Sequence, residues 1–202
     1  MAKVKRFINT NLTVLYQGLD MRFLDVGAFQ RLPGLEEDAY GSTFFNGPNG
    51  FQLMLPQRKM VIVVQAGGRV QVSDDLVKDP LESELVSKYF LNVYEQLKGF
   101  SNNVYGFNYA FQVEGLKLDS LLNKKLYKLV DASDVNQAAK IRYTVDGKKY
   151  EVRIEQEAGA FYRVFVNAER EVNISKIKSA VEVLNKEFKE DYKVAKGIVN
   201  EI

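Results

Sequence analysis

The sequence predicts an α+β protein with antiparallel sheets, each covered by a helix, in two halves of similar size. Segments in which apolar and polar residues alternate, as in strands, occur in groups. An amphipathic helical pattern follows each group, which is the order expected of such folds. Of the 202 residues, 46% are hydrophobic and 27% are charged, as in ordinary globular proteins. A chain of this length buries about 70% of its unfolded surface without needing a disulfide or a metal.

The first half begins with expected strands at Leu12–Tyr16 and Met21–Val26. Further strands at 51–55, 60–65 and 69–73 read as a meander that turns at Gly67 and Gly68. Between these groups lies Gly27–Gly50, with five glycines, two prolines and an acidic triplet. We expect a long loop there, and loops of this length in compact domains often have a function.

A helix is expected over residues 80–98. Asp79 is placed to cap it, Pro80 suits its first position, and Glu82 has capping-box spacing. The strand Val104–Glu114 follows, with an aromatic residue at nearly every second position, and then a shorter helix over 116–129.

The second half starts with a hairpin, in which alternating strands over 140–146 and 148–156 flank the turn at Asp146-Gly147. A third strand at Phe161–Asn167 precedes a long amphipathic helix that begins at Ser175 and has Asn173 or Ser175 as its cap. We therefore divide the chain into residues 1–130 and 138–202. One fused domain is the alternative.

The chain contains no histidine and no cysteine. Those two residues supply the usual general base, the soft metal ligands and the thiol nucleophile, so most familiar catalytic chemistry is excluded. The formal net charge of +2 gives no global attraction to nucleic acid or to an anionic membrane. No run of about 18 apolar residues occurs, so we expect no membrane span, and the lack of cysteine fits a cytoplasmic location.

Two chemical alternatives depend on particular residues. If the aromatic face of the 104–114 strand were exposed, its rings could stack on single-stranded nucleic acid, with nearby lysines at the phosphates. The ordinary interpretation is that this face belongs to the core. The residues concerned are Tyr105, Phe107, Tyr109, Lys124, Lys125 and Lys128. The second alternative is a Mg²⁺-dependent enzyme with Asp74 and Asp75 as ligands just past a strand end.

No phosphate-binding or nucleophile motif is present. The sequence thus favours a non-catalytic binding or assembly protein without a cofactor, whose partner is another protein or a second copy of the chain. The expected contact surfaces are the 27–50 loop and the far end of the C-terminal helix. Their candidate residues are Phe29, Arg31, Tyr40, Phe44, Phe45, Val194 and Ile198.

Overall fold

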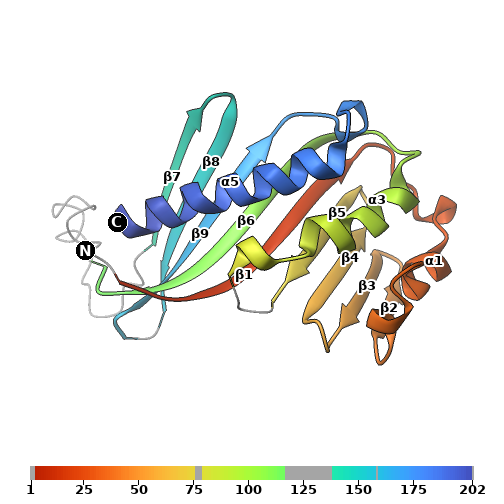
Figure 1. The fold of residues 1–202 in the computed structure, drawn as a ribbon, viewed down its shortest axis with the longest axis horizontal. Helices are drawn as coiled ribbons and strands as arrows, with labels where there is room; N and C mark the ends of the chain where they lie inside the picture. The colour runs from red at the N-terminus through yellow and green to blue at the C-terminus, as the bar shows by residue number, and fades with distance from the viewer. Residues whose placement is uncertain (1–2, 76–78, 117–137, 158, 202) are drawn as a thin grey trace.

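The structure is a computed structural model, which describes residues 3–75, 79–116, 138–157 and 159–201. It is a mixed helix and strand fold built on one large antiparallel sheet (Figure 1). Nine strands form this sheet in the order β2-β3-β4-β5-β1-β6-β9-β8-β7. The strands are β1 Lys3–Tyr16, β2 Thr43–Gly47, β3 Gly50–Leu55, β4 Met60–Gln65, β5 Arg69–Asp74, β6 Asn102–Glu114, β7 Ala138–Val145, β8 Lys148–Gln156 and β9 Phe161–Arg170.

The strand order follows a similar pattern on the two sides of the junction of β1 and β6, with one more strand on the β1 side. On one side β5, β4, β3 and β2 follow β1 outwards, and on the other β9, β8 and β7 follow β6. In the chain, helical segments follow the last strand of each group: those within residues 80–97 follow β5, and those within residues 174–201 follow β9. The strands that the sequence divides between two halves therefore belong to one continuous sheet, joined by the long pairing of β1 with β6.

The helical segments lie on one face of this sheet (Figure 1). The longest of them, α5, packs against β6 and β9, and its Phe188 ring lies 5.5 Å from Phe107 and 5.6 Å from Tyr109. The segments are η1 Met21–Phe23, α1 Val26–Arg31, α2 Glu36–Ala39, η2 Pro80–Glu82, the π-helical η3 Leu85–Phe90, α3 Leu91–Leu97, η5 Ile174–Lys176 and α5 Ala180–Glu201.

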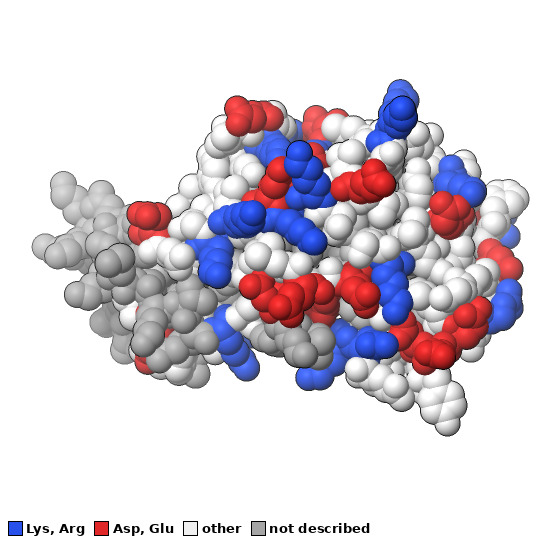
Figure 2. All heavy atoms as spheres, in the orientation of Figure 1, with Lys and Arg blue, Asp and Glu red and all other residues white. Residues whose placement is uncertain are grey.

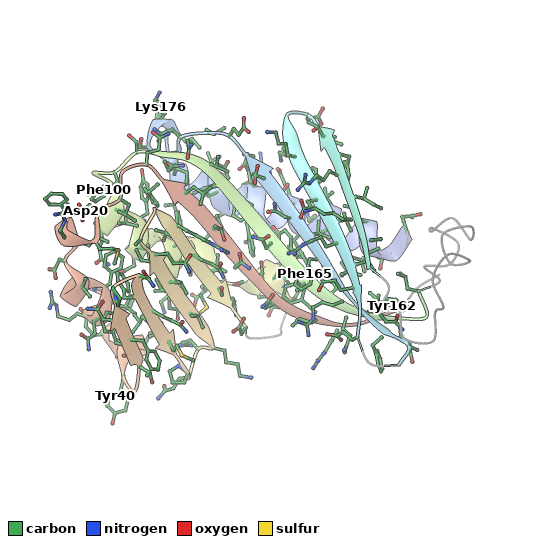
Figure 3. All side chains as sticks on the ribbon, turned by 180° about the vertical axis from the view of Figure 1, so that it is seen from behind. Asp20, Tyr40, Phe100, Tyr162, Phe165 and Lys176 are labelled. Atoms are coloured by element: carbon green, nitrogen blue, oxygen red, sulfur yellow. The ribbon has the colours of Figure 1, made fainter. Side chains whose placement is uncertain are left out.

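No helix among the described residues covers the opposite face of the sheet (Figure 3). Asn11, Asn108 and Asn167 lie side by side across β1, β6 and β9, and the Asn108 amide donates a hydrogen bond of 2.9 Å to Asn11 Oδ1. An antiparallel sheet with one face in water alternates apolar and polar residues along its strands. The burial of β4 and β8 has this alternation.

The meander and the hairpin lie where the sequence predicts them, but several expected elements differ, and the strand expected at 12–16 begins earlier, at Lys3. Met21–Val26 is not a strand: the Asp20 and Asp25 carboxylates accept backbone hydrogen bonds from Arg22 and Ala28, and these bonds start the turn η1 and the helix α1. Such local side-chain acceptors compete with strand pairing.

The helix expected over 80–98 is interrupted. Asp79 does accept a hydrogen bond from Leu81 N, at 3.0 Å, but this turn ends at Glu82 as 3₁₀-helix, and π-helix precedes α3. The C-terminal helix begins at Ala180 because Asn173 caps a separate short turn and Ser179 has a φ of +53°. The helix expected over 116–129 lies outside the described residues, apart from Leu116.

Candidate protein-binding surface

The segment Gly27–Gly50 folds into the short elements α1, α2 and β2 at one end of the sheet, in place of the expected loop. Phe29 of α1 is 1% exposed, and its ring lies 4.9 Å from that of Phe51. Phe29 therefore stabilises the core and offers no surface to a partner. Arg31 is exposed at the end of α1, where its guanidinium lies 3.4 Å from the Asp25 carboxylate.

Two aromatic side chains of this segment are exposed to solvent. Tyr40, which follows α2, is 77% exposed and projects from the β2 end of the molecule (Figure 3). Phe45 is 58% exposed on the open face of β2, whereas Phe44 points to the helix side and packs 5.5 Å from Phe51. Alternation along β2 therefore assigns Phe44 to the fold and Phe45 to the surface.

The same end of the molecule carries no charge over a long stretch of chain. No Lys, Arg, Asp or Glu occurs between Asp38 and Arg58, which is the longest such interval in the sequence. This interval includes Tyr40 and all of β2 and β3. In the space-filling view, the tip that projects at this end is drawn without charged side chains (Figure 2). We call Tyr40 together with β2 the β2 surface.

The two charges that flank this interval hold each other in place. Asp38 is buried, and it accepts hydrogen bonds from Arg58 Nε at 2.8 Å and from the Tyr89 hydroxyl at 3.1 Å. Lys88 Nζ lies 2.6 Å from Asp38 Oδ2, the oxygen that also accepts from Tyr89, whereas Arg58 donates to Oδ1. Burial alone would raise the pKa of Asp38, but the hydrogen bonds from Lys88, Arg58 and Tyr89 hold that pKa below its ordinary value. Asp38 thus anchors the start of the β2 surface to the helix η3.

The aromatic residues of β6 are in the core. Tyr105, Phe107 and Tyr109 are all buried beneath α5, so their rings are inaccessible to the bases of a nucleic acid. The Tyr109 hydroxyl donates to the backbone oxygen of Phe188 at 2.5 Å, and burial raises the pKa of Tyr109 well above its usual range. The lysines expected beside this strand, Lys124, Lys125 and Lys128, lie outside the described residues.

A buried charge network, which the sequence analysis missed, joins α5 to the sheet. Arg170 Nη2 donates to Asp191 Oδ2 at 2.5 Å, and Tyr150 donates to Asp191 Oδ1 at 3.1 Å. Tyr105 donates to Glu187 at 2.6 Å, and Glu187 lies 3.2 Å from Arg170 Nε. The sequence does contain a pattern that predicts this network. Arg170 continues the inward alternation of β9, and Asp191 falls within the apolar stripe of α5. The network positions a helix and exposes no reactive group.

The carboxylates expected to bind Mg²⁺ have other surroundings. Asp74 accepts a hydrogen bond from the Ser83 hydroxyl and lines a hollow of about 210 Å³ with Arg58, Asp79 and Glu82, whereas Asp75 is exposed. Over the described ranges, no group of three or more Asp or Glu residues is arranged to hold a metal ion.

The far end of α5 is the other expected contact surface. Val194 is 42% exposed and borders a hollow of about 260 Å³ with Tyr143 and Val145 of the hairpin. Ile198 packs partly against the core. Charged side chains of both signs are interspersed over this helix-covered face (Figure 2), so it has no large area of one charge.

Comparison of the sequence with models of known protein families gave no match, and comparison with curated proteins gave none either. Within the described part of the chain, no helix is both long enough and apolar enough to cross a membrane.

Proposed function

We propose that this protein is a non-catalytic binding protein and that it contacts its partner through the β2 surface. The observation that carries this proposal is the exposure of Tyr40 and Phe45 beside an edge strand without charge. Aromatic side chains are enriched at the centres of protein interfaces, and charged residues are depleted there.

The arrangement of the surface supports the same proposal. The buried Asp38 and the partly buried Phe44 fix the two parts of the β2 surface to the body of the molecule. A rigid aromatic group loses little conformational entropy on binding, so Tyr40 and Phe45 are suitable anchors for a partner. The nucleic-acid and Mg²⁺ alternatives gain no comparable support from the described residues.

The test compares two double variants in cells that make the protein. In the first, Tyr40→Ser and Phe45→Ser remove the rings of the β2 surface. In the matched control, Ile141→Ser and Val194→Ser remove exposed apolar side chains from the opposite end of the sheet and from α5. Proximity labelling of each variant, with its melting temperature measured in parallel, identifies the proteins near it.

We expect the proteins labelled by the wild type to be lost with the β2 variant and kept with the control. If the β2 variant is folded and labels the same proteins as the wild type, the β2 surface is not the contact surface. Loss with the control variant alone would instead assign the contact to the surface that carries Ile141 of β7 and Val194 of α5.

A further inference from the structure

We propose that the partner at the β2 surface is a second copy of this chain, joined by antiparallel pairing of the two β2 strands about a two-fold axis at Phe45. The proposal rests on the function proposed above and names its partner. It is carried by three features of β2: its free backbone groups, its self-complementary register and its lack of charge.

The hairpin between β2 and β3 determines which backbone groups of β2 are free. Gly47 and Gly50 flank a two-residue turn, so they form the closing hydrogen-bonded pair. Hydrogen-bonded pairs alternate along the ladder, and Phe45 with Gln52 is therefore the next one. The N–H and C=O groups of Phe44 and Asn46 consequently point away from β3, towards the free edge of the sheet. Among the described residues, β2 is the last strand at this end of the sheet.

These free groups match their own copies in one antiparallel register. With Phe45 opposite the partner's Phe45, each Phe44 lies opposite an Asn46 of the other chain, and both such pairs exchange two backbone hydrogen bonds. Phe45 forms a non-hydrogen-bonded pair with its copy, the type in which side chains approach most closely, at about 4.5 Å between Cα atoms. The two exposed Phe45 rings then cover each other on the open face.

The two ends of the sheet differ in how they meet another copy. Edge strands usually carry charges that prevent pairing with further strands. The opposite edge, β7, has Lys140 and Arg142, and self-pairing of β7 brings like charges together. β7 also carries the exposed apolar residues Ile141 and Val145, so the exposure of apolar side chains does not by itself distinguish β7 from β2. β2 has neither a charge nor a proline within it, so self-pairing there brings no like charges together.

The first measurement is the mass of the full chain by light scattering during gel filtration, over loading concentrations from about 10 μM to about 1 mM. We expect a monomer–dimer equilibrium that shifts to dimer as the concentration rises. A chain that remains monomeric throughout this range overturns the proposal.

The second measurement locates the two-fold axis. Because the chain has no cysteine, a single substitution introduces the only thiol. In the proposed register the Cα atoms of Phe45→Cys and its copy lie within the range that a disulfide spans, about 4.4–6.8 Å. With oxidised glutathione as oxidant, we expect Phe45→Cys to give a covalent dimer. Thr43→Cys, on the same face but off the axis, and Ile141→Cys on β7 are the controls and should remain monomeric. A covalent dimer from Ile141→Cys without one from Phe45→Cys contradicts the pairing.

The third measurement separates loss of the interface from loss of the fold. Phe45→Lys and Phe45→Glu each place like charges opposite one another in the dimer, so each alone should self-associate about tenfold more weakly or worse. An equimolar mixture should form a heterodimer, because the opposite charges then meet. Two folded variants that fail to associate when mixed overturn the register.

The outcomes also separate this proposal from the one it rests on. If the chain is monomeric but loss of Tyr40 and Phe45 still removes labelled neighbours, the β2 surface binds a different protein and only the second-copy proposal fails. If neither self-association nor labelling depends on Phe45, both proposals fail.

Discussion

The contribution of a buried charged residue to the stability of this protein depends on the groups that it contacts. Asp191 is fully buried, and it contacts Arg170, Tyr150 and, at 3.5 Å, Lys148. A buried ion pair adds little to stability when compared with apolar residues of the same size, but removal of one partner leaves an uncompensated charge. Removal of one partner should therefore destabilise the protein more than replacement of Arg170 and Asp191 together by apolar residues.

This asymmetry can be measured. Asp191→Leu should lower the free energy of unfolding by about 3–5 kcal/mol because it removes the buried carboxylate at Arg170 Nη2 and leaves Arg170 with Glu187 at Nε alone. Arg170→Met together with Asp191→Leu should recover most of that loss. Urea unfolding of the wild type, both single variants and the double variant gives the coupling free energy. Additive losses in the double variant would show that the two side chains act independently.

Asp38 predicts how stability depends on pH. Its folded-state pKa lies below the ordinary value of 3.8, so the unfolded state binds its proton more readily. The stability from Asp38 is then fully present above the unfolded pKa and is lost as the pH falls through the folded pKa. Asp38→Asn should cost about 1–3 kcal/mol near neutral pH, and this difference should shrink below about pH 4. Urea unfolding of both proteins at several pH values checks this, and a constant difference at all pH values would contradict it.

At the scale of elements, the β4–β5 turn contains two adjacent glycines, Gly67 and Gly68, and the space around them differs. Gly67 and Gly68 both have a positive φ, of +94° and +92°. A Cβ at Gly67 would have no atom within 4 Å, but one at Gly68 would lie 1.9 Å from the backbone oxygen of Tyr16. Only Gly68 meets β1 closely, and its own oxygen accepts a hydrogen bond of 2.8 Å from Tyr16 N.

Alanine at these two positions should therefore have unequal effects. Gly67→Ala should cost about 1–2 kcal/mol, from backbone strain alone. Gly68→Ala should cost about 3 kcal/mol or more, because β5 must also move away from β1. Thermal unfolding of both variants measures the difference, and equal losses would mean that the contact with Tyr16 relaxes freely.

The elements that the sequence predicts well are those whose signals are local. The hairpin of β7 and β8 follows from alternation and from Asp146-Gly147, whose two residues both have a positive φ as the turn demands. Apolar spacing predicts most of α5, and burial of Leu184, Phe188 and Val199 agrees with it. The predicted start of α5 is wrong because a capping residue such as Asn173 can begin a 3₁₀ turn as well as an α-helix.

The candidate site is harder to predict because exposure depends on contacts made far along the chain. Phe29, Phe44 and Phe45 look alike in the sequence, yet Phe29 and Phe44 pack against Phe51 of β3 whereas Phe45 is exposed. Tyr105, Phe107 and Tyr109 are covered by a helix about 80 residues later in the chain. The charge-free interval that ends at Arg58 was readable from the sequence, but its meaning depends on β2 being an edge strand, which only the sheet order establishes.

At the scale of the whole molecule, the strand β6 decides whether the chain has one cooperative unit or two. A division at residues 131–137 assigns β6 to the first unit, where it pairs with β1. However, β6 also pairs with β9 from Tyr105 to Glu114, and α5 packs on its aromatic residues. Separation of the two units would expose these rings and leave a long edge in the middle of the sheet, at a cost far above that of opening a linker.

We therefore expect the full chain to unfold in a single transition, with coincident curves from far-ultraviolet circular dichroism and from tyrosine absorbance, and with equal calorimetric and van't Hoff enthalpies. Tyr109→Ala should lower the melting temperature as a whole and keep the transition single, because its ring contacts Phe188 and Tyr192 of α5 from the central strand. In a protein of two independent units, the same variant would split the transition, with one part unchanged. A split of that kind would place the boundary after β6 and show that the pairing of β6 with β9 contributes little to the stability of the sheet.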